Sequence, residues 1–242
     1  MKVVPIASTL LYYGWLANET PYEAHPLRAG VSEADEVDEL AEVAGRLCYQ
    51  SWDRPNPKTA TNKGYLANIL AQGHESVLEH ASVTFYVEGV SRALLAELTR
   101  HRHLSFSVVS QRYVDATQLD MVRPPIMDEL DTETRNRVSD ILETQYQSAQ
   151  QAYKEIVEIL AAAGYKRKQA REAARAVLPN DTASPLIVTG NIRAWRDVLK
   201  KRHHVAADKE IQRFAAEVLS NLREIAPNSV QDIPDTPFGL EK

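Results

Sequence analysis

One cysteine, Cys48, stands among the 242 residues of the chain, and this scarcity excludes an internal disulfide. No stretch comes near the run of about 18 apolar residues that a membrane-spanning helix requires. The first residues lack the apolar core and the small-residue cleavage site of a secretory signal. We therefore expect no membrane association and a reducing, cytoplasmic environment.

Motifs for the common ways of binding nucleotides and metals are also missing. The chain contains neither a Gly-x-Gly-x-x-Gly fingerprint nor a P-loop, so a dinucleotide would have to occupy an unconventional site. The histidines and glutamates of residues 73–80 do not follow a zinc spacing such as His-Glu-x-x-His, and we predict no metal site. The formal net charge of −5 argues against nucleic acid as a partner.

Hydrophobic residues make up 44% of the chain and charged residues 25%, which is ordinary for a globular protein. Helical periodicity dominates and alternating stretches are few, so the sequence predicts an α+β fold. We expect a single domain over residues 1–242, with a poorly defined segment at 1–31 and a tail at 226–242. Strands are expected at 82–88, 184–189 and briefly 121–122, a polar connection at 74–80, and helices at 37–48, 61–72, 91–102, 132–163, 168–178, 191–203 and 208–225.

The segment 100–113 is the most informative part of the chain. Its fourteen residues include three arginines, two histidines, three serines and a tyrosine. The apolar residues among them would hold the segment against a core; they are Leu104, Phe106, Val108 and Val109. A stretch that is rich in cations and hydrogen-bond donors and is packed against a core suits a small anionic ligand.

A purely structural explanation of these arginines has to be weighed as well. Arg92 and Arg100 are eight residues apart on the helix expected at 91–102 and would share one face. Each arginine alone fits a surface ion pair with a carboxylate such as Glu97. Four arginines together with His101 and hydroxyl groups favour an anion site, because forked guanidinium groups match a monophosphate.

Three further segments carry polar patterns with two interpretations each. Residues 73–80 are either a loop that contacts a cofactor or a capping turn with incidental histidines. Residues 166–179 form a basic helix that is either a solvated face or a nucleotide contact. Residues 190–197 lead from a strand into a helix, and they form either an anion or amide site or a helix start capped by Asn191.

Arg100-His101-Arg102, Ser110 and Arg112-Tyr113 together resemble the signature of the flavin-dependent thymidylate synthases. The resemblance covers roughly residues 40–225. It implies that family's fold, in which a small, mostly antiparallel sheet packs with several long helices. Arg100-His101-Arg102 is a specific pattern when it occurs with the serine and the arginine-tyrosine pair.

The resemblance also implies roles for individual residues, which we carry over by position. The expected FAD contacts are His74, Ser76, Glu79, Arg100, His101, Arg102, His103, Asn191, Arg193 and Asp197. The expected dUMP contacts are Arg92, Glu97, Arg100, Ser110, Gln111, Arg112, Lys168, Arg175 and Arg202. Catalytic roles are expected for Arg112 at the uracil ring, for Ser110 in orienting dUMP, and for Arg202.

The activity that the resemblance implies is reductive methylation of dUMP to dTMP. In such enzymes 5,10-methylenetetrahydrofolate supplies the carbon and NADPH supplies the reductant through FAD. Family members are homotetramers whose active sites are shared between subunits. The long helix at 132–163 and the alanine-rich helices would offer surfaces for that packing.

Two positions depart from the family pattern. Val108 stands where some members have a glutamate, and Ala206 stands where a histidine often follows Arg202. Cys48 ends an apolar helical stripe without a histidine beside it, so we expect a buried, small hydrophobic residue. The expected mechanism uses no cysteine nucleophile.

Two functions from other classes remain as alternatives. A non-catalytic nucleotide- or RNA-binding module would use the same arginines, but only Phe106 and Tyr113 are available there for base stacking. A hydrolase acting on a nucleotide phosphate would need a cluster of metal-binding carboxylates or histidines, which the sequence does not offer. The presence of a bound flavin would distinguish all three.

Overall fold

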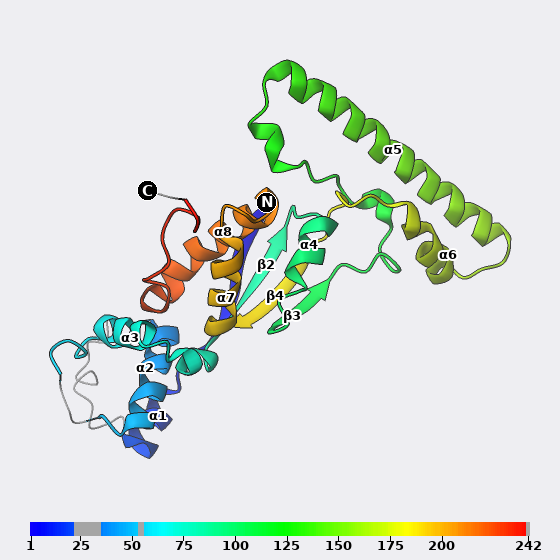
Figure 1. Cartoon of the computed structure of the whole chain (residues 1–242). Helices are drawn as coiled ribbons and strands as arrows, with labels where there is room; N and C mark the ends of the chain where they lie inside the picture. Colours follow the sequence, from blue (N-terminus) through cyan, green and yellow to red (C-terminus); the bar gives the residue numbers. More distant parts are fainter. Residues whose placement is uncertain (22–34, 53–55, 241–242) are drawn as a thin grey trace. The chain divides into compact units, whose positions relative to one another are not determined.

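The computed structural model describes residues 1–21, 35–52 and 56–240. These residues form an α+β structure with a small sheet and eight α-helices, as the sequence predicted (Figure 1). The strands are β1 (Lys2–Ser8), β2 (Ser82–Glu88), β3 (Leu104–Val108) and β4 (Leu186–Asn191). The α-helices are α1 (Tyr13–Glu19), α2 (Glu36–Tyr49), α3 (Asn62–Ala71), α4 (Arg92–Leu98), α5 (Thr132–Ala162), α6 (Arg167–Ala174), α7 (Ile192–Arg202) and α8 (Lys209–Ile225). Short 3₁₀ helices are η3 (Glu75–Glu79), η4 (Ala116–Gln118), η5 (Pro125–Asp128), η6 (Arg175–Val177) and η7 (Pro227–Ser229).

The four strands follow the order β1-β2-β4-β3, and Figure 1 shows β2 and β4 running in opposite directions. Val83, Phe85 and Val87 of β2 are fully buried and alternate with more exposed residues, as a half-buried strand requires. β1 lies at an edge of the sheet. An edge strand tolerates Pro5, because the N–H that proline lacks is not needed on the outer side of the ladder.

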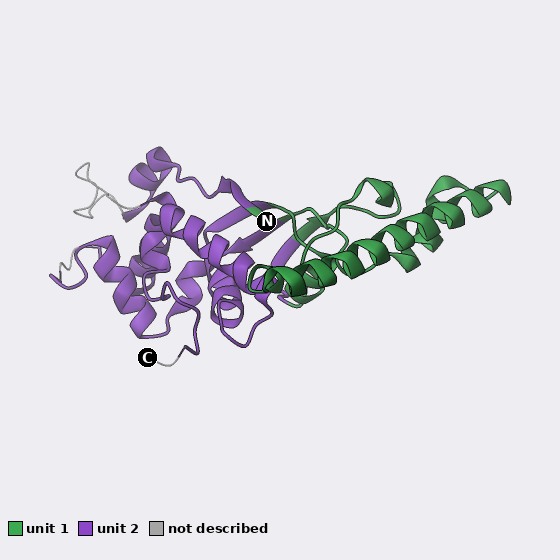
Figure 2. Ribbon diagram, turned by 90° about the horizontal axis from the view of Figure 1, so that it is seen from above, with its two compact units in different colours: residues 1–2, 87–100, 106–187 green, residues 3–86, 101–105, 188–242 purple. Residues whose placement is uncertain are grey.

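The chain divides into two compact units (Figure 2). Unit 1 comprises residues 1–2, 87–100 and 106–187, and unit 2 comprises residues 3–86, 101–105 and 188–242. Four of the five boundaries between the units fall inside a strand, and the fifth, between residues 100 and 101, lies in the turn between α4 and β3. The expectation of a single domain over the whole chain stays a prediction.

The core of unit 2 is organised around Trp195 on α7. Its ring meets Phe85 edge-on with centroids 5.0 Å apart, and its Nε1–H donates to the carbonyl of Val83 at 3.1 Å. A Cβ atom at Gly190 would stand 2.5 Å from Leu104 Cδ2 and 3.2 Å from the Trp195 indole. β4 therefore needs glycine at its end, where the chain turns into α7.

Unit 1 contains α4 and the long helix α5, beside which α6 packs. Ala116, Tyr153 and Ala174 form a buried cluster between η4, α5 and α6. The hydroxyl of Tyr146 donates to the carbonyl of Leu119 at 2.6 Å. Of the 31 residues of α5, the buried ones are Tyr146, Ala149 and Tyr153, so most of this helix is in contact with solvent.

Most of the elements expected from the sequence are present. The strand at 82–88 and the helices at 37–48, 61–72, 132–163, 191–203 and 208–225 are confirmed within about two residues at each end, which is the usual uncertainty of helix limits. The expected helix at 168–178 is α6 followed by η6. The strand-like run at 184–189 forms β4 with a shift of two residues, and the strand expected at 121–122 is a single bridge between Met121 and Thr182.

Three expectations were wrong. The helix expected at 91–102 ends at Leu98, so Arg100 and Arg102 do not lie on it. The reason is that the chain must bury His101 and then Leu104, with which β3 begins. The polar connection at 74–80 contains the 3₁₀ helix η3, and Cys48 is exposed rather than buried.

The two ends of the chain are more ordered than their sequences indicated. The segment 1–31 contains β1 and α1 among its described residues. In the tail at 226–242, Val230 and Ile233 are buried. None of the described helices combines the length and the apolar character that crossing a bilayer would need.

Candidate functional site

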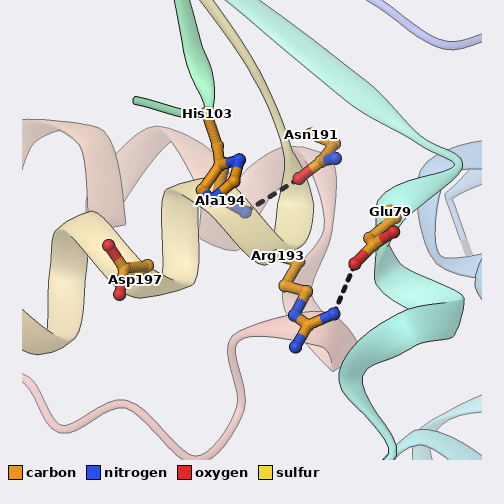
Figure 3. Close-up of a pocket in the computed structure, with 6 residues that line it drawn as sticks. All are labelled: Glu79, His103, Asn191, Arg193, Ala194 and Asp197. Atoms are coloured by element: carbon orange, nitrogen blue, oxygen red, sulfur yellow. Dashed lines mark hydrogen bonds and ion pairs between the residues drawn. The ribbon is translucent and has the colours of Figure 1, made fainter. Parts of the chain in front are cut away.

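A cavity of about 420 Å³ opens in unit 2 at the start of α7 (Figure 3). This volume falls within the range of roughly 300–1,000 Å³ that small-molecule sites occupy. Its lining residues are Glu79, His103, Asn191, Arg193, Ala194 and Asp197. Five of these six residues are flavin contacts expected from the sequence, and they come from three segments far apart in the chain.

The start of α7 is fixed by Asn191, whose side-chain oxygen accepts the N–H of Ala194 at 2.8 Å. This confirms Asn191 as the helix cap, and Figure 3 shows its amide nitrogen turned away from Ala194. Arg193, the second residue of the helix, forms an ion pair with Glu79 at the end of η3. Both side chains are 49% exposed, so solvent screens this pair.

His101 is buried and connects two other site residues of unit 2. Arg202 Nε–H donates to His101 Nε2 at 3.1 Å, which leaves Nδ1 of the neutral ring as the donor to Asp197 Oδ2 at 3.3 Å. Burial lowers the pKa of His101, with the nearby Arg202 charge acting in the same direction and Asp197 in the opposite one. Burial would raise the pKa of Asp197, but Lys201 holds it below its usual value. The neutral ring of His101 therefore connects the carboxylate of Asp197 to the guanidinium group of Arg202 and orients that group.

The remaining flavin candidates do not line the cavity. His74 accepts or donates a hydrogen bond with the Tyr49 hydroxyl at 3.1 Å and stacks on its ring with centroids 6.2 Å apart. Ser76 is an exposed residue of η3, and Arg100 and Arg102 are exposed in the turn before β3. Arg100 also belongs to unit 1, whereas the other flavin candidates belong to unit 2.

In unit 1 the turn that carries Ser110 and Arg112 packs against α6. Arg171 donates to the carbonyl of Tyr113 at 2.5 Å and to Asp115 Oδ2 at 3.0 Å. Arg112 lies 3.9 Å from the Glu172 carboxylate, which is longer than a hydrogen bond. The nucleotide-binding turn expected from the sequence is thus held in place by a helix that lies more than fifty residues further along the chain.

Two cations stand beside the exposed ring of Tyr113. Lys168 Nζ is 5.3 Å and the Arg112 guanidinium carbon 5.9 Å from the ring centroid. A hydrogen bond and the charge of Lys168 lower the pKa of the Tyr113 hydroxyl, and the Arg112 charge adds to the effect. Unit 1 therefore brings Arg112 and Lys168 of the dUMP candidates together on one positive surface.

The other dUMP candidates are spread over unit 1, with one exception. Arg92 and Glu97 are half-buried on α4, Gln111 is buried, and Arg175 is exposed at the start of η6. Arg202 is the exception, because it belongs to unit 2 together with the flavin candidates.

Sequence reasoning missed a group of charged residues beside the cavity. Arg196 on α7 binds Glu75 of η3 and Asp232 of the tail, and Lys200 also binds Glu75. A signal was present, because Arg196 lies four residues after Ile192 and three before Leu199 on the apolar face of the helix. A charge on such a face predicts a buried partner.

Within the described residues, no group of three or more histidine, cysteine or carboxylate side chains has the arrangement of a metal site.

Comparison with known proteins yields one consistent result. A model of the protein family described as thymidylate synthase complementing protein matches residues 31–228. The probable flavin-dependent thymidylate synthase of Mycobacterium phage D29 is 56% identical over 239 residues, which cover 98% of each chain. That of Mycobacterium phage L5 is 58% identical over 203 residues, covering 84% of this chain and 83% of the phage protein. The flavin-dependent thymidylate synthase of Mycobacterium tuberculosis is 46% identical over 228 residues, covering 91% and 89%.

Proposed function

Since the chain belongs to the family of flavin-dependent thymidylate synthases, we propose that it methylates dUMP to dTMP. In this proposal 5,10-methylenetetrahydrofolate is the carbon donor, and NADPH is the reductant acting through FAD. The observation that carries the proposal is the cavity of unit 2. There Glu79, His103, Asn191, Arg193 and Asp197, which the sequence pointed to as flavin contacts, line one space.

The lining of the cavity fits a flavin in its chemistry. Glu79 is neutralised by Arg193 and Asp197 by Lys201, so the cavity offers alternating donors and acceptors without a large net charge. Such a lining suits the uncharged hydrogen-bonding edge of a flavin ring or the hydroxyls of its ribityl chain. The anionic pyrophosphate of FAD needs cations, and the exposed Arg102 is the expected donor in unit 2.

Bound FAD would supply redox chemistry that no amino-acid side chain provides, and the protein would contribute binding, orientation and electrostatics. Arg112 is assigned to the uracil carbonyls, where a guanidinium stabilises negative charge that develops on the ring. Its 3.9 Å separation from Glu172 supports this role, because a substrate oxygen can replace so loose a partner at little cost. Ser110 is assigned to orienting dUMP through its hydroxyl.

Arg202 is assigned to the substrate as an oriented donor. Its Nε–H donates to His101, and this bond fixes the orientation of the guanidinium fork. Asp197 sets the tautomer of His101 and in this way the direction of the fork.

We also propose that the reaction uses no cysteine nucleophile. Cys48 is exposed on the last turn of α2 and does not line the cavity. A thiol at this position is far in sequence from the groups that line the cavity and belongs to another helix, and membership of the family supports the same mechanism. The active enzyme is proposed to be a cytoplasmic homotetramer of single-domain chains with shared sites, without nucleic acid or a membrane as partner. The exposed Ile141 and Ile159 on α5 support packing between subunits.

The test is a flavin measurement followed by a turnover measurement. The purified protein is expected to be yellow, or to become yellow with added FAD, and to release FAD on denaturation. With dUMP, methylenetetrahydrofolate and NADPH it is expected to form dTMP, and omission of any one of them should abolish product. A protein that remains colourless and binds no added FAD would refute the proposed function. A non-catalytic nucleotide-binding module would bind dUMP but form no dTMP.

A further inference from the structure

Arg196 is a buried arginine on α7 with four hydrogen bonds to two distant parts of unit 2. Its side chain is 1% exposed. It binds both carboxylate oxygens of Asp232, at 2.6 and 2.8 Å, and donates to the carbonyl of Ser229 at 2.6 Å. Its second terminal nitrogen also donates to Glu75 Oε1 at 3.2 Å. One side chain thus joins α7 to the C-terminal segment 229–232 and to η3.

The two ends of η3 are both attached to α7, but in different ways. Glu75, its first residue, is bound by Arg196 and by Lys200, whose Nζ lies 2.6 Å from the same carboxylate oxygen. Glu79, its last residue, is bound by Arg193. Between these two points lies Ser76, a flavin candidate. The polar contacts between η3 and α7 therefore comprise one attachment to a buried arginine and one exposed attachment, beside the buried side chains Val77 and Leu78 of η3.

The exposed attachment is the one that a ligand must disturb. Arg193 and Glu79 both line the cavity, and each is half exposed to solvent. A ligand that takes hydrogen bonds from Arg193 competes directly with Glu79, and an exposed ion pair resists such competition weakly. If this pair were the sole polar attachment, η3 would lose its polar contacts with α7 as the cavity filled.

The buried attachment cannot open in the same way. Burial would raise the pKa values of Glu75 and Asp232, but hydrogen bonds and charge from Lys200 and Arg196 hold both below their usual values. Both carboxyl groups therefore stay ionised at neutral pH. Separating them from Arg196 would leave a buried charge without a partner, which is strongly unfavourable.

We propose that Arg196, with Glu75 and Asp232, is a positioning residue that keeps η3 on α7 while the Arg193–Glu79 pair opens to admit the flavin. This inference rests on the proposed function. It makes the C-terminal segment 229–232 part of the support of the cofactor site, although none of its residues lines the cavity. Arg196 itself does not contact the cofactor.

The test compares two aspartates of the tail at 226–242, Asp232 and Asp235. Asp232→Asn removes the charge that holds Arg196, whereas Asp235→Asn removes an ion pair with Arg223 that does not involve η3. FAD affinity is measured by fluorescence titration of the apoprotein, at a temperature well below the unfolding midpoint of each variant. We expect Asp232→Asn to weaken FAD at least tenfold and Asp235→Asn to stay within twofold of the wild type.

A second measurement reports on η3 without any cofactor. Amide hydrogen exchange over residues 75–80 is expected to be faster in Asp232→Asn than in the wild type and unchanged in Asp235→Asn. A double-mutant cycle with Glu75→Gln tests whether Glu75 and Asp232 are coupled through Arg196. The losses in FAD affinity from Glu75→Gln and Asp232→Asn should be less than additive, and those from Glu75→Gln and Asp235→Asn should add.

The outcomes separate the possible errors. If Asp232→Asn lowers the unfolding temperature but leaves FAD affinity within twofold, the cluster is only structural and the inference is wrong. If exchange over 75–80 is unchanged, Arg196 does not hold η3 and the inference is also wrong. A wild-type protein that binds no FAD would overturn the proposed function and the cofactor part of this inference, while the exchange measurement would still decide whether the attachment exists.

Discussion

Arg171 and Arg175 lie one helical turn apart in the same basic segment, yet their surroundings differ. The Arg171 side chain is 12% exposed and holds Tyr113 and Asp115 in the turn after Arg112. Arg175 is exposed at the start of η6, and its side chain makes no hydrogen bond or ion pair with the described part of the chain. Replacing each by alanine should therefore separate a residue that binds the nucleotide from one that holds the binding turn.

The expected magnitudes follow from the contacts. A guanidinium hydrogen-bonded to a phosphate contributes roughly 1.5–3 kcal/mol, so Arg175→Ala should weaken dUMP by about ten- to a hundredfold. Its effect on stability should be within about 0.5 kcal/mol, as for most surface substitutions. Arg171→Ala removes two hydrogen bonds to a partly exposed turn, and after allowance for solvent screening we expect a loss of about 2 kcal/mol. For a chain of this size that loss lowers Tm by about 4–8 °C.

The assay pairs thermal unfolding with calorimetric titration of dUMP in the presence of FAD. Arg175→Ala is expected to lose dUMP affinity at nearly unchanged Tm, and FAD affinity should not change. Arg171→Ala is expected to lose both Tm and dUMP affinity, because the turn bearing Ser110 and Arg112 loosens. Wild-type dUMP affinity in the Arg175 variant would show that its assignment to the nucleotide is wrong. Wild-type Tm in the Arg171 variant would show that the turn is not held by α6.

Three further predictions concern other parts of the chain. Cys48→Ser should leave dTMP formation nearly unchanged; loss of turnover with intact FAD binding would disprove the mechanism without a thiolate. Gly45→Ala places a Cβ 2.4 Å from the Tyr65 hydroxyl and should lower Tm by about 2–8 °C, from overpacking of about 1–3 kcal/mol reduced by the helix preference of alanine. Gly14→Ala, which meets nothing within 4 Å, is the matched control and should not lower Tm. Because burial lowers the folded pKa of His101 below its ordinary 6.5, the unfolded chain binds more protons below pH 6.5 and stability should fall as pH decreases through that window. His101→Gln should flatten this part of the profile of unfolding free energy against pH, and an unchanged profile would mean that another group titrates.

The helices α2, α3, α5, α7 and α8 were predictable from the sequence because each carries a periodic apolar stripe. Tyr146, Ala149 and Tyr153 of α5 recur at helical spacing, and Asp131 caps that helix through the N–H of Thr134. β2 was equally clear, because its alternating residues are local evidence of a half-buried strand. In these elements the local preference and the tertiary structure agree.

The strands at the two edges of the sheet could not be found in the same way. Pro5 interrupts the pattern of β1, and only its position at the edge makes the proline acceptable. In β3, Leu104 and Phe106 do alternate with Ser105 and Ser107, but the polar residues of the signature dominated the interpretation. The early end of α4 had no local signal, because it depends on the burial of His101 in another part of the fold.

Site residues were found from their pattern, but their partners were not. Arg193 and Glu79 are 114 residues apart, and His101 and Asp197 are 96 residues apart. These pairs exist because α7 places its first two turns beside η3 and the turn before β3. A single sequence does not contain that placement, which is also why the attachment of η3 through Arg196 and Asp232 remained hidden.

The positions of the unit boundaries restrict how this protein can evolve by recombination. Each unit is assembled from three separate pieces of the chain, so no contiguous gene fragment encodes one unit alone. A single crossover with a related gene would therefore exchange parts of both units instead of one whole unit. The flavin candidates of unit 2 and the nucleotide candidates of unit 1 are consequently inherited together, and changes in one set are selected in the presence of the other.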